Sequence, residues 1–380
     1  MKTTLNKHIF LIIPELNFFL SHRLILVRGL VDKGWNFTII TSFDIKPQNE
    51  PGIRYEIFDT HRKRFSFLNL IKNALRLVKL INSEDPILIY AVSHRSIFLA
   101  RVANLIVKKK SLYAISGMGS IFSEKSNLKK GIKNSILQLI VIKIYRYFIR
   151  SKNSYFLLQN KDDFKFLIQS KITTLNRIFK IEGNGIEEAK FNNYEAPKSS
   201  IRFVMVSRLL RDKGVLEFLQ AANNIHNKNN LINCEFILYG DVDKENFNTL
   251  GLKDIEGFLS DKIIYAGYKS DIQACIKDAS VVVLPSYREG FSKVLMEAQA
   301  CARPVITSNV TGCRDVIINN VTGFLAEPMN IKELQQKIEL FISEPKLASE
   351  MGTNAYKHAL ENFTITKAVD RHLDMFSKIL

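Results

Sequence analysis

The sequence predicts an α/β protein built of two Rossmann-like domains that face each other across a cleft. Length is the first observation behind this fold class, because a chain of 380 residues exceeds what one hydrophobic core usually supports. The second is that short β-rich runs alternate with longer helical patterns from end to end, which is typical of parallel sheets covered by helices on both faces. The third is an aperiodic polar stretch, FNNYEAPKSSIR, that separates two such series.

Each series contains its own predicted strands. In the first half they lie at residues 9–13, 37–41, 87–92, 112–115 and 155–159. In the second half they lie at residues 203–207, 236–239, 263–266, 281–284 and 304–307. We therefore predict an N-terminal domain over 1–190, a linker at 191–202, a C-terminal domain over 203–360, and a last helix at 361–380 that crosses back to the first domain. Ligands of such sheets bind at the carboxyl ends of the strands, so a site is expected in the loops that follow them.

The positive charge of the chain is concentrated in its first half. The net charge is +17, and residues 1–190 hold 32 Lys and Arg against 14 Asp and Glu, whereas residues 191–380 hold 22 against 23. A coding bias would affect both halves alike, so the asymmetry indicates a function. Within residues 128–152, helical spacing puts basic residues on one half of a helix and apolar residues on the other. The basic residues are Lys129, Lys133, Lys143, Arg146 and Arg150.

This basic amphipathic segment has two interpretations, and we predict that both apply. It is a core helix with a basic solvent face, and it is also a surface that an anionic membrane attracts. Nucleic acid is not an expected partner, since no binding motif accompanies the charge. The apolar run at 9–13 ends at Pro14 and Glu15, and no other run approaches the roughly 20 residues of a membrane span, so we expect neither an export signal nor a span. The four cysteines form no CxxC pair, so we expect packed, reduced thiols in a cytosolic protein.

The stretch SYREGFSKVLMEAQACARPVI carries Glu289 and Glu297 on either side of a predicted helix start. A helix that begins near Ser292 directs its first amides at an anion, and Gly290 lets the ligand approach the backbone closely. Three interpretations of the two glutamates are open. The first is that they are the acid and base of a glycosidase. The second is a structural role, with Glu289 near the helix dipole and Glu297 on a solvated helix face, and the third is that they accept hydrogen bonds from hydroxyl groups at the two ends of a ligand.

We favour the hydroxyl acceptors. Glycosidase carboxylates lie about 5–9.5 Å apart, whereas eight residues of helix span about 12 Å, so a hydrolytic pair is disfavoured. Arg208 and Lys213 follow the strand at 203–207 and are expected to hold a diphosphate, although either cation alone is also explained as a solvated turn residue.

Several motifs in a fixed order resemble a known family. SRLLRDKGVLEFLQAA, YAGY, VVVLPSYREGFSKVLMEAQACARPVITSNVTGCRDVI and VTGFLAEP resemble the second domain of retaining glycosyltransferases of family 4, which have the two-Rossmann architecture called GT-B. The resemblance implies that Arg208 and Lys213 bind the diphosphate of a nucleotide-sugar during catalysis. It implies that Glu289 contacts the transferred sugar and Glu297 the ribose. The donor site is then completed by Gly290, Phe291, Ser292, Lys293 and Val294.

The first half resembles the family more loosely. FFLSHRLILVRGLVDKGWNFTIITS looks like the opening of members that build bacterial surface polysaccharides, and ISGMGSIF looks like their glycine-rich loop. EGNGIEEAKF resembles their interdomain turn, which implies that Asn184 and Gly185 touch the donor. YAVSHRS departs from the family, which often carries His and Lys-Pro where this chain has Tyr90, Arg95 and Ser96. A lone histidine near a strand end is more often structural than functional. The acceptor-side candidates are His22, His94, Arg95, Gly117 and Gly119.

The resemblance implies a retaining enzyme that moves a hexosyl or N-acetylhexosaminyl group from a nucleotide-sugar, with UDP expected, to a saccharide on polyprenyl diphosphate. We expect it to act in O-antigen, capsule or other surface-glycan assembly, on the inner face of the plasma membrane. No cofactor and no metal are expected, because GDVD at 240–243 is the nearest approach to a DxD motif and is interpreted as a strand-end loop. The alternatives are a nucleotide-sugar epimerase of the same fold and a non-catalytic membrane-surface scaffold.

Overall fold

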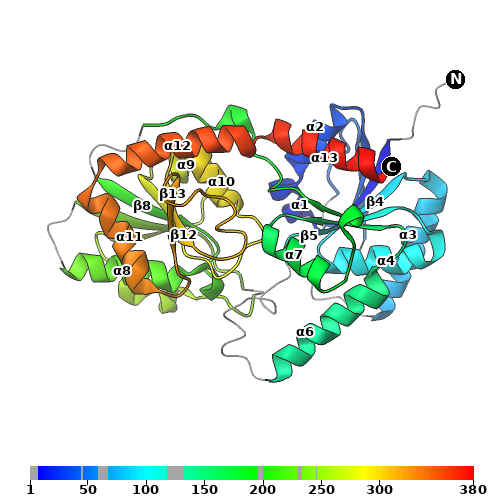
Figure 1. The fold of residues 1–380 in the computed structure, drawn as a ribbon. Helices are drawn as coiled ribbons and strands as arrows, with labels where there is room; N and C mark the ends of the chain where they lie inside the picture. Colours follow the sequence, from blue (N-terminus) through cyan, green and yellow to red (C-terminus); the bar gives the residue numbers. More distant parts are fainter. Residues whose placement is uncertain are drawn as a thin grey trace. The chain divides into compact units, whose positions relative to one another are not determined.

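The computed structural model of the protein describes residues 7–43, 46–58, 67–117, 132–195, 200–228, 233–244 and 246–380. The chain forms two compact units, one of Met1–Gly185 with Ile365–Leu380 and one of Ile186–Thr364. Each unit contains one parallel β-sheet with helices packed on it, which confirms the predicted fold class of two Rossmann-like domains (Figure 1). The chain leaves the first unit after Gly185, before the stretch expected as a linker, and returns to it at Ile365.

The sheet of the first unit has the strand order β3-β2-β1-β4-β5-β6-β7. Because β1 pairs with both β2 and β4, the order of the strands reverses beside β1. The strands are β1 (His8–Glu15), β2 (Asn36–Ser42), β3 (Ile53–Ile57), β4 (Leu88–Val92), β5 (Ser111–Ile115), β6 (Ser154–Leu158) and β7 (Ile178–Lys180). The helices are α1 (Leu16–His22), α2 (Leu24–Val31), α3 (Phe67–Glu84), α4 (His94–Val107), α6 (Ile132–Ile144), the π-helical η3 (Tyr145–Ile149), α7 (Lys161–Gln169) and α13 (Ile365–Ile379).

The last helix, α13, packs on the first unit, although it follows the whole second unit in sequence (Figure 1). Phe376 packs against Trp35 with ring centroids 4.9 Å apart and the rings tilted by 52°, and the buried His372 lies beside Tyr90 of β4. The chain returns tightly, because a Cβ on Gly185 would lie 2.8 Å from the Cα of Ile365.

The sheet of the second unit has the strand order β10-β9-β8-β11-β12-β13. Its strands are β8 (Ile201–Val206), β9 (Cys234–Tyr239), β10 (Ile263–Gly267), β11 (Val281–Leu284), β12 (Val305–Ser308) and β13 (Gly323–Ala326). The helices that cover it are α8 (Val215–Lys228), α9 (Ile272–Lys277), α10 (Lys293–Ala300), α11 (Ile331–Ser343) and α12 (Lys346–Asn362).

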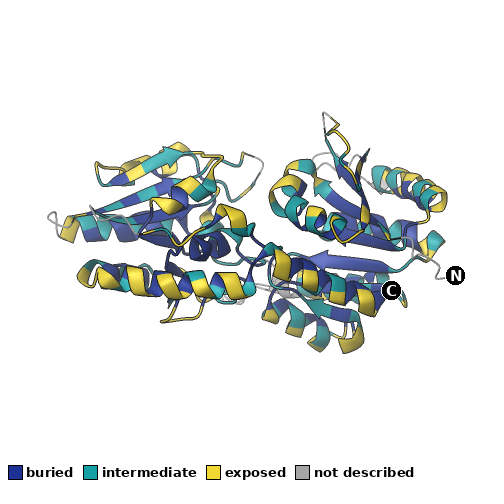
Figure 2. Ribbon diagram, turned by 90° about the horizontal axis from the view of Figure 1, so that it is seen from above, coloured by how far each residue is buried: buried dark blue, intermediate teal, exposed yellow. Residues whose placement is uncertain are grey.

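The central strands of both sheets are buried on both faces, while the helices turn one face outward (Figure 2). This burial explains why β1, β4 and β11 are nearly continuous apolar runs in the sequence. All four cysteines are free and buried, as expected for packed thiols. None of the helices in the described part of the chain is long and apolar enough to span a membrane.

Candidate functional site

The second sheet reverses its strand order between β8 and β11, which are hydrogen-bonded neighbours. In open parallel sheets, such a reversal separates the loops at the carboxyl edge and leaves room for a ligand. The loop after β8 carries Arg208 and Lys213, and the loop after β11 carries Glu289. The fold therefore brings together at one sheet edge three side chains that the sequence marked for the same site.

Lys213 and Glu289 form an ion pair at this edge. The Lys213 Nζ atom lies 2.6 Å from Oε1 of Glu289, and the side chains are only 19% and 14% exposed. The hydroxyl of Ser286 donates to the same carboxylate oxygen at 2.8 Å. Ser286 was not selected from the sequence, although its position three residues before Glu289 is a usable signal. Glu289 is thus held in one orientation by a cation and a hydroxyl.

The backbone around Glu289 is fixed by the turn that follows β12. The amide of Glu289 donates to the carbonyl oxygen of Thr311 at 3.0 Å, and the amide of Ser292 donates to that of Gly312 at 3.2 Å. Gly312 has a φ of +77°, and a Cβ there would lie 2.3 Å from the carbonyl oxygen of Glu289. One expectation is corrected here, because the Ser292 amide is occupied by a carbonyl group and does not face an anion.

The start of α10 nevertheless presents the positive end of a helix dipole. Ser292 occupies the N-cap position, but its side chain makes no capping hydrogen bond. The amide of Val294 belongs to the first turn of the helix, so no carbonyl of the helix accepts its hydrogen bond. It points along the helix dipole, whose positive end favours an anionic group.

Arg208 is oriented by a carboxylate from the neighbouring loop. Its Nη1 atom lies 2.6 Å from Oδ2 of Asp243, in the loop after β9, and its side chain is 59% exposed. The sequence placed GDVD at a strand end but did not pair Asp243 with Arg208. A mostly exposed guanidinium held at one end keeps donors for a further acceptor.

Glu297 lies one helical turn beyond Lys293 and is almost completely buried, with 8% of its surface exposed. Its Oε1 atom is 3.3 Å from Nζ of Lys293, whereas its Oε2 atom is buried with no hydrogen-bond partner among the described residues. Desolvation raises the pKa of this carboxyl group, while Lys293 opposes the rise. A buried carboxylate oxygen without a donor is costly, so the site is suited to a ligand hydroxyl at this position.

In the first unit, the acceptor-side candidates follow β1, β4 and β5 at the carboxyl edge of the sheet. His94 begins α4 and its Nδ1 atom is hydrogen-bonded to the hydroxyl of Tyr145. Burial lowers the pKa of His94, so the imidazole is held neutral. Ser93, just before it, has a φ of +77°, a strained value for a residue other than glycine. Arg95 follows in the first turn of the same helix.

The other first-unit candidates are less constrained by the fold. His22 ends α1, where its ring stacks on Phe18 with centroids 4.6 Å apart and its Nδ1 atom lies 2.6 Å from the Ser21 hydroxyl. Gly117 follows β5. Gly119 lies outside the described residues.

Two further predictions look different in the structure. Tyr90 belongs to β4 and is buried in the core, where the Nη1 atom of Arg23 donates to its hydroxyl at 2.9 Å, so it does not form a loop. Gly185 is buried against Ile365, and this packing explains the glycine better than a contact with a donor. Asn184 is held by the side-chain amide of Gln159 at 3.1 Å.

Two Rossmann-like units, with this reversal of strand order between β8 and β11, give the chain the GT-B fold. Residues 186–358 match the family described as "Glycosyl transferases group 1", and residues 8–159 match "Glycosyl transferase 4-like". The chain therefore contains a group 1 glycosyltransferase domain and, before it, a glycosyltransferase 4-like domain, as the motifs implied.

Named relatives and solved structures agree with this assignment. The chain is 27% identical to the N,N'-diacetylbacillosaminyl-diphospho-undecaprenol alpha-1,3-N-acetylgalactosaminyltransferase of Campylobacter jejuni, over 95% of this chain and 98% of that protein. It is 24% identical to the UDP-Gal:alpha-D-GlcNAc-diphosphoundecaprenol alpha-1,3-galactosyltransferase of Escherichia coli, over 86% and 84%. A Rickettsia africae glycosyltransferase shares the fold with a TM-score of 0.78 at 20% identity, covering 98% of both chains. Anabaena HepE, solved with UDP and glucose, has a TM-score of 0.74 at 17% identity, covering 97% of this chain and 99% of its own.

Proposed function

We propose that this glycosyltransferase moves a hexosyl or N-acetylhexosaminyl group, with retention of configuration, from a UDP-sugar to a saccharide on polyprenyl diphosphate in bacterial surface-glycan assembly. Two relatives are named for undecaprenyl-diphosphate-linked saccharides, and one of them for UDP-galactose. The match to the Campylobacter jejuni protein extends over both units of the chain, so it includes the acceptor side as well as the donor side.

The observation that carries the proposal is the Lys213–Glu289 ion pair at the strand reversal, beside the first turn of α10. A nucleotide-sugar has a diphosphate between two sets of hydroxyl groups. Lys213, Arg208 and the positive end of the α10 dipole supply the cationic side, while the carboxylates of Glu289 and Glu297 supply acceptors for sugar and ribose hydroxyls. The orphaned Oε2 atom of Glu297 is the acceptor we assign to the ribose.

In the proposed reaction, the bond between the anomeric carbon and the diphosphate oxygen breaks, and a bond to the acceptor oxygen forms on the same face of the sugar. The acceptor proton passes to the leaving diphosphate. Lys213, Arg208 and the helix dipole stabilise the charge that develops on that group, an effect worth several kcal/mol in other enzymes. With these cations in place, we propose that transfer needs neither a divalent metal nor a cofactor.

We further propose that the enzyme binds peripherally to the cytoplasmic face of the plasma membrane, where a lipid-linked acceptor resides. The middle of α6 supports this placement, because four of its apolar side chains are exposed. The end of α6 packs against the core through Val141 and Ile144, and η3 joins the core through Tyr145 and Ile149. The exposed residues are Ile136, Leu137, Leu139 and Ile140.

The decisive experiment incubates the purified protein with a panel of nucleotide-sugars, with and without a polyprenyl-diphosphate saccharide, in the presence of EDTA. We expect a glycosylated lipid from a UDP-sugar only when the acceptor is added, and an NMR coupling that shows the donor's anomeric configuration in the product. Conversion of the nucleotide-sugar without acceptor would identify an epimerase. Binding to lipid without turnover of any donor would identify a scaffold.

A further inference from the structure

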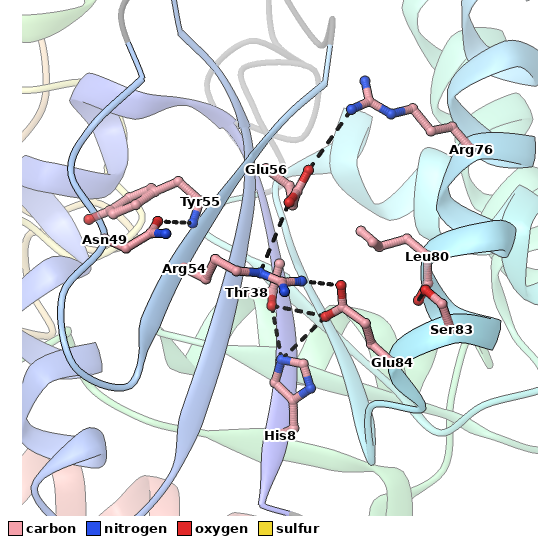
Figure 3. A network of polar contacts seen from close by, with 10 residues as sticks. All are labelled: His8, Thr38, Asn49, Arg54, Tyr55, Glu56, Arg76, Leu80, Ser83 and Glu84. Atoms are coloured by element: carbon pink, nitrogen blue, oxygen red, sulfur yellow. Dashed lines mark hydrogen bonds and ion pairs between the residues drawn. The ribbon is translucent and has the colours of Figure 1, made fainter.

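The amino edge of the first sheet, opposite the edge that carries the acceptor-side candidates, has two chemically different ends. At the β1–β3 end, cations face carboxylates (Figure 3). Arg54 pairs with Glu84, and Glu56 lies 4.0 Å from Arg54 and 3.9 Å from Arg76. His8 also approaches Glu84, at 3.9 Å. The charges at this end are balanced within the protein.

A groove next to the β5 and β6 starts has part of its positive charge balanced by a carboxylate. It has a volume of about 440 Å³ and contains three consecutive lysines, Lys108 to Lys110. Lys109 pairs with Asp85, and Nζ of Lys110 donates to the main-chain oxygen of Leu380 at 3.0 Å. This groove therefore contains an acidic side chain that neutralises one of its three lysines.

The groove at the β6–β7 end is different. It has a volume of about 660 Å³ and lies where η3 and the segment before β7 converge. Four of its lining residues are cationic and none is acidic. The lining residues are Arg146, Tyr147, Arg150, Ser151, Lys152, Thr174, Asn176 and Arg177.

The three arginines of this groove donate to carbonyl groups. Arg177 Nη1 donates to the carbonyl oxygens of Ser151, at 3.0 Å, and of Lys152. Arg146 donates to the carbonyl of Ser170, and its buried Nε atom has no partner in the described structure. Among the described residues, no carboxylate forms an ion pair with any of the four cations. Carbonyls orient a guanidinium without neutralising it, so the groove keeps a concentrated positive charge.

We propose that this groove is a phosphate-binding site, separate from the donor site, and that its occupant is the phosphate of an anionic lipid headgroup. Guanidinium groups match phosphate oxygens in pairs, and the hydroxyls of Ser151 and Thr174 add further donors. Two observations favour a lipid as the source of the phosphate. Tyr147, at the rim of the groove, is 75% exposed. The exposed apolar side chains of α6 lie close by in sequence, because α6 continues directly into η3. The proposal does not depend on which sugar is transferred.

The test compares two double variants of the full chain that lose the same charge. Arg150→Gln/Lys152→Gln removes two exposed cations of the groove without removing the anchoring contacts of Arg146 and Arg177. Lys72→Gln/Lys79→Gln removes two exposed cations of α3 as the control. Thermal melting verifies that both fold. Binding is measured by calorimetry with inorganic phosphate and by sedimentation with vesicles of phosphatidylglycerol or of phosphatidylcholine.

We expect saturable binding to phosphatidylglycerol vesicles, weakened about tenfold or more by the groove variant and little changed by the control. If the protein binds the vesicles and calorimetry shows no binding of inorganic phosphate, the site is assigned to a lipid headgroup. If it binds inorganic phosphate tightly and does not bind vesicles, the site is assigned to a free phosphate, and the lipid as its occupant is overturned. Equal weakening by both double variants, or no binding of either probe by the wild type, overturns the site itself.

Discussion

Lys213 and Glu289, 76 positions apart in sequence, meet as an ion pair with 2.6 Å between Nζ and Oε1. They come from the loops after β8 and β11, the two strands between which the order of the sheet reverses. The proposed diphosphate cation and the proposed sugar-binding carboxylate are thus neighbours. A change in either side chain is therefore expected to alter the other, which makes their effects on catalysis non-additive.

Lys213→Ala and Arg208→Ala should each lower kcat/KM for the donor by about ten- to a hundredfold, since each removes a charge-assisted contact worth roughly 1.5–3 kcal/mol. Steady-state kinetics with varied UDP-sugar measures the effect. Arg211→Ala is a matched control, because Arg211 lies in the same turn, is 55% exposed and forms an ion pair with Asp254 at 3.6 Å. Wild-type kinetics in a folded Arg208→Ala/Lys213→Ala variant would refute the diphosphate assignment.

Glu289→Gln and Glu297→Gln should separate transfer from nucleotide binding. Glu289→Gln is expected to reduce transfer more than affinity for UDP, because its proposed contact is to the sugar. Glu297→Gln is expected to weaken UDP binding itself, because its unpaired Oε2 atom is assigned to the ribose. Calorimetry with UDP, alongside turnover assays, distinguishes the two, and equal losses of UDP affinity would contradict this division of roles.

Gly312→Ala should destabilise the second unit and lower donor use together. The φ of +77° disfavours alanine, and the new Cβ would collide with the carbonyl of Glu289. We expect a loss of about 1–3 kcal/mol in the free energy of unfolding, measured by denaturant titration. Gly257→Ala is the control, since no atom lies within 4 Å of its Cβ position and its φ is not positive. A Gly312→Ala variant as stable and active as the control would show that this turn does not hold Glu289 in place.

The sequence predicted the central strands of both sheets, and the strands that it missed lie at the edges. The missed strands are β3, β7 and β13, and each lies at an edge of its sheet. Edge strands are short or face solvent on one side, so they lose the continuous apolar run that marks a strand buried on both faces. In β3, Arg54 and Glu56 alternate with buried residues, and β7 has three residues.

The site could be predicted residue by residue but not as a set of contacts. Motif order identified Lys213, Glu289 and Glu297, because each follows a strong strand or lies in a clear helix. The pairing of Arg208 with Asp243, and the bond from the Ser292 amide to Gly312, join loops that are distant in sequence. Such contacts depend on strand order, which local patterns do not encode.

The buried His372 of α13 should make stability depend on pH. Burial, reinforced by the nearby Arg23, lowers the pKa of His372 to about 3, while its bond to the Ala368 carbonyl opposes the shift. In the unfolded chain His372 takes up a proton near pH 6.5, whereas in the folded protein it stays neutral at that pH. Its contribution to the free energy of unfolding is therefore fully present above about pH 7 and falls as the pH drops through 6.5. By pH 5 this one group should cost about 2 kcal/mol.

Thermal melting of the wild type and His372→Gln from pH 8 to pH 5 measures this contribution. The difference between the two Tm values should stay constant above pH 7, where the imidazole is neutral in both states, and shrink or reverse toward pH 5. Parallel pH profiles over the whole range would show that His372 is not the group responsible.

Membrane association should depend on the apolar residues of α6 as well as on charge. In α6, Leu139 and Ile140 are 57% and 48% exposed, so Leu139→Ser/Ile140→Ser removes apolar surface without touching the core. We expect this variant to sediment less with anionic liposomes, since each buried apolar side chain contributes about 1.5–3 kcal/mol. Attraction to the basic first half should also weaken as salt rises, because the Debye length falls from about 10 Å at 0.1 M to about 3 Å at 1 M.

The control for this prediction is Leu105→Ser/Ile106→Ser on α4, whose side chains are 51% and 59% exposed. It removes a similar apolar area from the same unit while leaving α6 intact. If α6 enters the membrane interface, only the α6 variant is released, and the wild type retains part of its binding at 1 M salt. Binding that is abolished by salt alone, with both variants behaving as the wild type, would mean that the protein contacts the lipid surface through its charges and that α6 stays outside the bilayer.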